Sequence, residues 1–272
     1  LQSKGISVMV VDFGPLTQDP DLRTLDDLIV GYLVPVLQTA IKGKGPPVTL
    51  LGYCMGGVLL AGAAAHLPTP AARHIFLATP WDIEAEDPVF TQLVRSFMPS
   101  VAPILVGAAT LAAGHMQALF AMLDPHDAAQ KFARFARLRM DDPVADLFVL
   151  TENWLQSGGD LPAPLVAQVL QQWYGENALA HGKWRVGGKK ISARGLAEVP
   201  SLVVTAGRDR LVERAVAMAL YDALKKSRGH VDLLSPDVGH IGLMASARAH
   251  TAVWDPIADW ILTFQEADKG PR

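Results

Sequence analysis

The sequence predicts an α/β fold with a mostly parallel sheet flanked by helices, and two observations predict it. Short runs rich in β-branched residues alternate with helical stretches, which is typical of parallel strands joined by crossover helices. Each run is almost continuously apolar, as expected for a strand covered on both faces. The predicted strands are Val8–Phe13, Val48–Tyr53, His74–Thr79, Ser201–Thr205 and Val231–Leu234. The predicted helices are Asp26–Thr39, Gly56–His66, Val212–Lys226 and Ala252–Phe264.

The alternation of strands and helices stops after Pro80. The pattern from residue 84 to residue 190 is mostly helical, with scattered proline and glycine. We interpret this stretch as a helical cap inserted between two strands, above the carboxyl end of the sheet. The predicted organisation is therefore a first part of the core at 1–83, the cap at 84–190 and a second part of the core at 191–272.

Composition excludes several classes of protein. A chain of 272 residues is long enough for a substantial core. Its net charge of −3 argues against a nucleic-acid binder, which needs a basic face to displace counterions from phosphates. A single cysteine excludes an internal disulfide framework, and no Cys/His cluster has the spacing of zinc ligands. We therefore expect no metal site and a reducing, cytoplasmic location.

One long apolar stretch needs a separate interpretation. No Asp, Glu, Lys or Arg occurs from Ser96 to Leu123, which is long enough to span a membrane. Prolines, glycines and polar residues interrupt it, and no Lys/Arg cluster marks a cytoplasmic side. We therefore expect no transmembrane span. The favoured interpretation is a helical hairpin buried against the core. The alternative is an exposed apolar lid that docks on an apolar ligand or surface.

The strongest local signal is Gly52-Tyr53-Cys54-Met55-Gly56, which ends a strand and opens a helix. It matches the nucleophile elbow G-x-S-x-G with cysteine in place of serine. The turn is too tight for side chains on either side of the nucleophile, so we predict that Cβ atoms at Gly52 and Gly56 would clash with the backbone. The helix N-terminus points at the sulfur and favours thiolate, and the Met55 N–H is a predicted oxyanion donor. The alternative is a small buried cysteine in a strand-to-helix turn.

A thiolate nucleophile needs a histidine base and an orienting acid. His240 is the one histidine of eight that follows a late strand in a glycine-flanked turn, so we predict it as the base. Asp209 follows the preceding strand and is the predicted acid. Asp82 ends an earlier strand and is the rival acid. If Asp209 is the acid, we expect Trp81 and Asp82 to line the pocket, the alternative roles being a core aromatic and a helix N-cap.

Together with further motifs, these residues resemble polyhydroxyalkanoate synthases, enzymes of the α/β-hydrolase fold with a cysteine nucleophile. The cysteine box and the segments around Asp209 and His240 resemble those of the family. The other matching segments are Val10-Val11-Asp12-Phe13-Gly14, Thr79-Pro80-Trp81-Asp82, and Trp173 to Leu179 followed by a glycine-containing turn at Val186–Lys189. The resemblance covers most of the chain and is closest to the shorter synthases that pair with a second subunit.

The resemblance implies a function. Such an enzyme polymerises (R)-3-hydroxyacyl-CoA through an acyl group on Cys54, with His240 and Asp209 assisting, and releases CoA. It implies no cofactor beyond the CoA thioester that is the substrate. The implied partners are the acyl-CoA and the growing polyester, together with a homodimer partner or a second synthase subunit. The implied location is the cytoplasm, at the surface of polymer granules.

The chain departs from the family at its beginning. In the family, further strands and one oxyanion-donating loop precede the strand that matches Val8–Phe13. Without them we expect a gap between that strand and the strand leading to Cys54, or direct pairing of the two. We therefore expect the chain to be a piece of a longer protein. The activity of the isolated 272 residues is in doubt because Met55 supplies one oxyanion donor alone.

Three other functions remain open from the sequence. An intracellular polyester depolymerase or a thioesterase would use the same Cys-Asp-His triad for hydrolysis. A dienelactone-hydrolase-like enzyme shares the cysteine box, but the long stretch between Cys54 and Asp209 disfavours it. A non-catalytic protein that binds polymer granules would keep the triad only as a relic.

Overall fold

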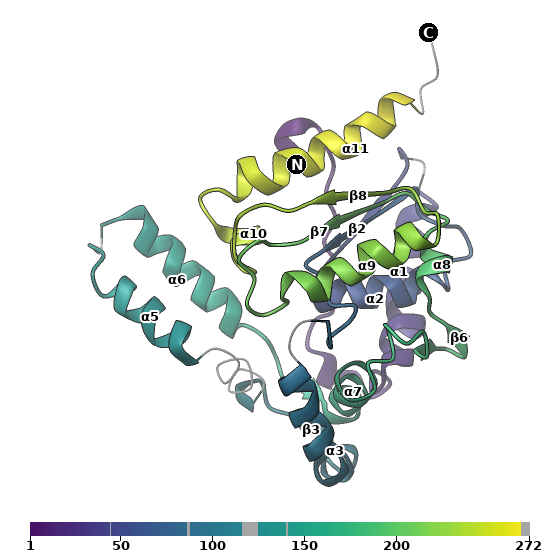
Figure 1. Cartoon of the computed structure of the whole chain (residues 1–272), viewed down its shortest axis with the longest axis vertical. Helices are drawn as coiled ribbons and strands as arrows, with labels where there is room; N and C mark the ends of the chain where they lie inside the picture. Colours follow the sequence, from purple (N-terminus) through teal and green to yellow (C-terminus); the bar gives the residue numbers. More distant parts are fainter. Residues whose placement is uncertain (44, 86–87, 116–124, 140, 268–272) are drawn as a thin grey trace.

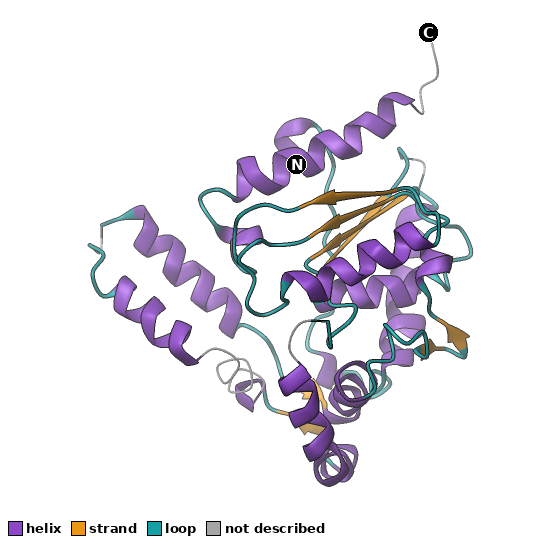
Figure 2. Ribbon diagram, in the orientation of Figure 1, coloured by secondary structure: helices purple, strands orange, loops and turns teal. Residues whose placement is uncertain are grey.

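The central element of the computed structural model is a four-stranded parallel sheet (Figures 1 and 2). The strands follow one another in the order β1-β2-β7-β8. They are β1 (Thr49–Tyr53), β2 (Arg73–Leu77), β7 (Ser201–Val204) and β8 (Val231–Leu234). The predicted parallel sheet is therefore confirmed, with four of its five predicted strands. The structure describes residues 1–43, 45–85, 88–115, 125–139 and 141–267.

Helices cover both faces of the sheet, because successive strand residues point to opposite sides. Phe76 of β2 faces one core, which is shared with the helices η3, α1, α2 and α9. Its neighbours Ile75 and Leu77 face a second core beneath η5 and α11, which Figure 1 shows on the other side of the sheet. These helices are η3 (Asp27–Leu33), α1 (Val34–Ile41), α2 (Met55–Ala64), α9 (Arg214–Lys226), η5 (His250–Trp254) and α11 (Asp255–Ala267).

The segment between β2 and β7 is mostly helical. Its helices are α3 (Pro88–Gly107), α5 (Pro125–Phe135), α6 (Pro143–Gln156), α7 (Ala163–Gln168) and η4 (Val169–Gly175), followed by the short α8 (Ala193–Leu196). Two small antiparallel pairs join them: β3 (Thr110–Leu111) with β4 (Leu161–Pro162), and β5 (Arg185–Val186) with β6 (Lys189–Lys190). The α5–α6 pair stands away from the sheet (Figure 1), and its two helices meet through stacked Phe135 and Phe148 rings.

Residues 96–107 of the apolar stretch lie in α3. Met98 and Leu105 are buried, whereas Phe97 and Ile104 are 56% and 70% exposed. The described part of this stretch is therefore a half-buried helix with an apolar outer face rather than a fully buried hairpin, and residues 116–123 lie outside the described residues. Among the described helices, none combines the length and the apolar character needed to cross a membrane.

The predicted strand Val8–Phe13 is wrong, because this segment has no regular secondary structure. A strand needs a hydrogen-bonding neighbour, and the segment does not pair with β1, so the predicted gap is what the structure has. Its middle is open to solvent, with Val10 86% exposed. The segment is held near its ends instead, where Ile6 packs below α11 and Phe13 lies against the Tyr32 ring.

The close approach of α2 to the sheet requires two glycines, and one of them differs from the prediction. A Cβ at Gly52 would lie 2.5 Å from the Gly56 carbonyl oxygen, which confirms the need for glycine there. A Cβ at Gly56 would meet nothing within 4 Å, so the predicted need at Gly56 is wrong. The tight contact is one residue later, where a Cβ at Gly57 would lie 1.9 Å from Thr79 Oγ1. The reason is that adjacent helical positions point in different directions, and only Gly57 faces the end of β2.

Alanine substitutions in the first turn of α2 test this packing. Gly57→Ala is expected to lower the free energy of unfolding by about 1–3 kcal/mol, because the new methyl overlaps the buried Thr79 side chain. Gly56→Ala is the matched control and is expected to change it by less than about 1 kcal/mol. Urea unfolding of both variants measures the difference. Equal losses in the two variants would contradict the packing described above.

Candidate active site

Cys54 occupies a sharp turn between the end of β1 and the start of α2. Its backbone angles, φ 53° and ψ −124°, are unfavourable for any residue with a side chain. Two hydrogen bonds hold the turn: the Cys54 N–H donates to the Leu77 carbonyl at 2.8 Å, and the Gly57 N–H donates to the Cys54 carbonyl at 2.9 Å. The half-buried thiol is therefore held at the carboxyl edge of the sheet by the neighbouring strand and its own helix.

Asp209 and His240 meet at the same carboxyl end of the strands. The His240 Nδ1 donates to Asp209 Oδ2 at 2.7 Å. The Asp209 side chain is completely buried, and its other oxygen accepts the N–H groups of Leu211 and Val212 at 2.9 and 2.8 Å. Both oxygens of the buried carboxylate are therefore hydrogen-bonded, which offsets its loss of water. This leaves the other nitrogen of the His240 ring available to face Cys54.

The pKa of His240 reflects its two partners. Burial alone lowers this pKa, but hydrogen bonds to Asp209 and Cys54, together with their negative charges, raise it to about 9. His240 is therefore protonated at neutral pH. An imidazolium in contact with the Cys54 sulfur favours the thiolate, which is the reactive form of cysteine.

Two tyrosines lie close enough to Cys54 for its negative charge to raise their pKa values. Burial and the negative charge of Cys54 raise the pKa of Tyr174 to about 12. Burial, Cys54 and Asp209 also raise the pKa of Tyr53. Both phenols therefore stay protonated at neutral pH and can donate hydrogen bonds.

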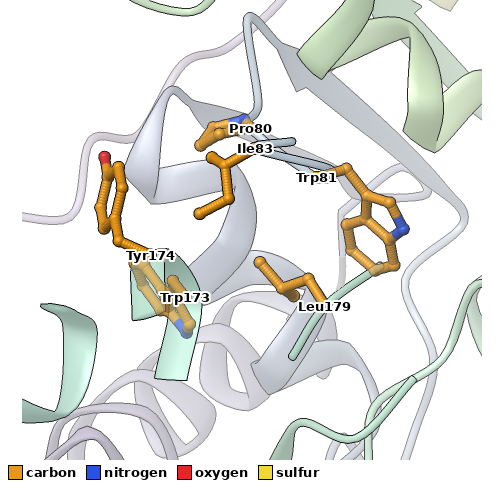
Figure 3. A pocket seen from close by; sticks show the side chains of 6 residues that line it. All are labelled: Pro80, Trp81, Ile83, Trp173, Tyr174 and Leu179. Atoms are coloured by element: carbon orange, nitrogen blue, oxygen red, sulfur yellow. The ribbon is translucent and has the colours of Figure 1, made fainter. Parts of the chain in front are cut away.

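The predicted oxyanion and pocket residues have different placements. Met55 is the first residue of α2, so its N–H has no acceptor within that helix and points toward the thiol end. Trp81 is buried and lines a small apolar cavity together with Pro80, Ile83, Trp173, Tyr174 and Leu179 (Figure 3). Ile83 and Cys54 both pack against the cluster of Val212, Val216 and Ala217, and Tyr174 of the cavity interacts electrostatically with Cys54, so the cavity lies near the nucleophile.

Asp82 is not among the residues that line this small cavity, and its place in a substrate pocket stays a prediction. Its Oδ1 accepts the Asn177 Nδ2 at 2.7 Å and the Glu84 N–H at 3.0 Å. The Asn177 Oδ1 in turn accepts the Ile83 N–H at 3.4 Å. Asn177 is buried and adopts a φ of 46°, so its amide is aimed at this one loop. The Asp82 carboxylate thus accepts a hydrogen bond from the Asn177 amide, whereas the carboxylate that pairs with His240 is that of Asp209.

Sequence reasoning missed the roles of Tyr53 and Asn177. Tyr53 was one variable position of the cysteine box, although its ring packs on His240. Asn177 lay in a segment noted for its family resemblance, and its partner is 95 positions away. No local pattern connects such distant residues. The joint occurrence of two family-like motifs was the one available signal for the Asp82–Asn177 pair.

Within the described residues, no group of three or more His, Cys, Asp or Glu side chains lies close enough together to hold a metal ion.

The sequence of the chain is similar to those of two curated polymerase subunits. No protein-family model matches the chain. The poly(3-hydroxyalkanoate) polymerase subunit PhaC of Haloferax mediterranei is 24% identical over 268 residues, which are 98% of this chain and 54% of that protein. The subunit of the same name from Allochromatium vinosum is 26% identical over 263 residues, covering 96% of this chain and 73% of that protein. The chain is a relative of these polymerase subunits.

Solved structures with a related arrangement are more distant from this chain. A monoacylglycerol lipase of Paleococcus ferrophilus has a TM-score of 0.46 at 14% identity, covering 86% of this chain and 75% of the lipase. MenH from S. aureus has a TM-score of 0.42 at 15% identity, covering 88% of this chain and 76% of MenH.

The protonation of His240 makes stability depend on pH. Its pKa of about 9 in the folded chain lies above the ordinary value of 6.5, so its contribution is complete below pH 6.5 and is lost as the pH rises through 9. The free energy of unfolding of the wild type, relative to His240→Gln, is expected to fall by about 3 kcal/mol over that interval. Urea unfolding at several pH values measures it. Parallel curves for the two proteins would contradict the raised pKa.

The Asp82–Asn177 contact can be measured with a double-mutant cycle. Asn177→Ala, Asp82→Ala and the double variant are expected to show a coupling free energy of about 1–3 kcal/mol, because the amide donates to a charged acceptor. The cycle cancels the separate cost of alanine at a positive φ. Additive effects of the two substitutions on urea unfolding would show that the contact is not formed in solution.

Proposed function

We propose that the chain carries out acyl transfer from a 3-hydroxyacyl-CoA to a growing polyester, through a thioester on Cys54. The observation that carries the proposal is the contact of His240 with both Cys54 and the buried Asp209. The polymerase subunits to which the chain is related support the choice of substrate. The chain spans 54% of the length of the Haloferax subunit and 73% of the length of the Allochromatium subunit.

The first step forms the acyl-enzyme. The Cys54 thiolate attacks the thioester carbonyl, and the developing oxyanion accepts the Met55 N–H. As the carbonyl re-forms, the bond to the CoA sulfur breaks, and protonated His240 gives its proton to the departing CoA thiolate. One thioester replaces another, so the step changes the free energy little. An ester on a serine would be lower in free energy, and transfer of the acyl group from it would be less favourable.

The second step lengthens the polyester. The 3-hydroxyl oxygen of another unit attacks the acyl group on Cys54, and His240, now neutral, takes the hydroxyl proton. The bond between carbon and Cys54 sulfur breaks, an ester forms, and the thiolate–imidazolium pair is restored. The hydrogen bond from His240 to Asp209 keeps the imidazole ring in place throughout.

The apolar surroundings of Cys54 suit a reaction in which water must not compete with the hydroxyl. Trp81, Ile83 and Tyr174 line the cavity beside the thiol. A side-chain environment of this kind excludes water and strengthens the hydrogen bonds within the site. Hydrolysis on the same triad remains the alternative outcome, in which water takes the place of the 3-hydroxyl.

The remaining assignments follow from this chemistry. A CoA thioester is already activated, so we propose that the reaction needs no resident cofactor. We also propose that the chain works in the cytoplasm at the surface of polymer granules, as a homodimer or with a second synthase subunit. The exposed apolar side chains of α3, Phe97 and Ile104, are consistent with a place beside an apolar polymer.

CoA release from 3-hydroxybutyryl-CoA tests the proposal. Cys54→Ala is expected to lower the rate of release by about 10³-fold or more, because the nucleophile is lost. Release can be followed with a thiol reagent, and the product by chromatography. Polymer is the expected product. Equal rates in the two proteins would remove Cys54 from the mechanism, and free 3-hydroxybutyrate as sole product would make the chain a hydrolase.

A further inference from the structure

The nucleophile and the base follow strands at opposite sides of the sheet. Cys54 follows β1 at one edge of the sheet, whereas β8 forms the opposite edge. His240 lies six residues after the end of β8, so its loop has to pass β7 and β2 to reach the thiol. Asp209, which follows β7, holds the ring from the middle of this path. The segment that carries His240 across the sheet therefore needs a contact close to Cys54 that holds it in place.

Tyr53 provides that attachment. Its O–H donates to the backbone carbonyl of His240 at 3.1 Å. Its ring also lies against the imidazole, with 5.0 Å between the ring centroids and 31° between the planes. One side chain therefore contacts both the main chain and the side chain of the base. Asp209 bonds to the edge of the imidazole, and Tyr53 packs against its face.

The direction of Tyr53 follows from the alternation of β1. Leu50 and Gly52 face α2, and Gly52 meets the backbone of that helix. Tyr53 therefore points to the other face, where it packs against the core cluster that includes Val238 and Leu243, which lie on either side of His240 in the sequence. Because Cys54 is the next residue, the same backbone segment presents the nucleophile and anchors the base.

We propose that Tyr53 is a positioning residue that holds the His240 imidazole at the Cys54 sulfur. The phenol fixes the carbonyl of His240, and the ring limits rotation of the imidazole out of the plane set by Asp209. The inference rests on the proposed function only through the Cys54–His240 pair. It assigns to the second position of the cysteine box a role in orienting the base rather than in filling the core.

Alkylation of Cys54 tests this role without any acyl-CoA. Cys54 is the single cysteine of the chain, so iodoacetamide incorporation followed by mass spectrometry reports on it alone. Thiolate reacts and thiol does not, so the rate at neutral pH depends on how well His240 stabilises the thiolate. At about pH 10 most thiols are ionised without help, and the rate no longer depends on His240.

Two substitutions separate the contributions of the hydroxyl and the ring. Tyr53→Phe is expected to lower the alkylation rate at pH 7 by about fivefold, the equivalent of one hydrogen bond. Tyr53→Leu also loses the ring contact and is expected to lower it by about tenfold or more. Both profiles should shift to higher pH and converge with the wild type near pH 10. A side chain that only fills the core would not move the profile.

Tyr32→Phe is the matched control. Tyr32 also donates to a backbone carbonyl, that of Asp12, at 3.1 Å, and its ring also has a tilted aromatic neighbour, Phe13, at 5.6 Å. It lies outside the triad, so its removal is expected to leave the alkylation profile unchanged. Circular dichroism of every variant establishes that it is folded.

The outcomes are distinct. A wild-type profile in folded Tyr53→Phe and Tyr53→Leu, or an equal shift in Tyr32→Phe, would overturn the inference. Tyr53→Phe keeps the ring and decides the question by itself if Tyr53→Leu does not fold. A shifted profile in a chain that releases no CoA would leave the positioning role standing while removing the proposed polymerisation.

Discussion

The backbone turn at Cys54 is the constraint on which the rest of the structure depends. A single residue joins β1 to α2, and it adopts a φ of 53° that is held by hydrogen bonds to Leu77 and Gly57. This turn brings α2 so close to the strand that Gly52 and Gly57 have no room for a side chain. The turn places the thiol at the N-terminus of α2, where the peptide dipoles and the Met55 N–H favour negative charge.

The parallel sheet supplies the remaining chemistry, because the carboxyl ends of all its strands meet at one edge. Asp209 follows β7 and His240 follows β8, and both converge on the residue that follows β1. Burial of Asp209 is tolerated because both of its oxygens are hydrogen-bonded. A cysteine nucleophile with a histidine partner is suited to the proposed thioester substrate, since the nucleophile and the leaving group are then chemically alike.

Contacts between distant segments complete the site. Asn177, from the helical region between β2 and β7, holds the loop that carries Trp81 and Ile83 beside the thiol. Tyr53 joins the opposite edges of the sheet through His240. The first contact shapes the apolar cavity, and the second orients the base. Each links one family-like motif to another that is distant in the sequence, which is why neither role was visible from one motif alone.

The sequence by itself determined four of the five predicted strands, their helices, and the residues Cys54, Asp209 and His240 as candidates, because these follow from local patterns and chain order. It failed at Val8–Phe13, since strand propensity does not supply a pairing partner. It also placed the tight contact at Gly56 instead of Gly57, and it did not find the contact between Asp82 and Asn177. Only the tertiary structure decided these points and the position of Tyr53 on His240. They depend on which distant surfaces meet, and a short stretch of sequence holds no information about its neighbours in space.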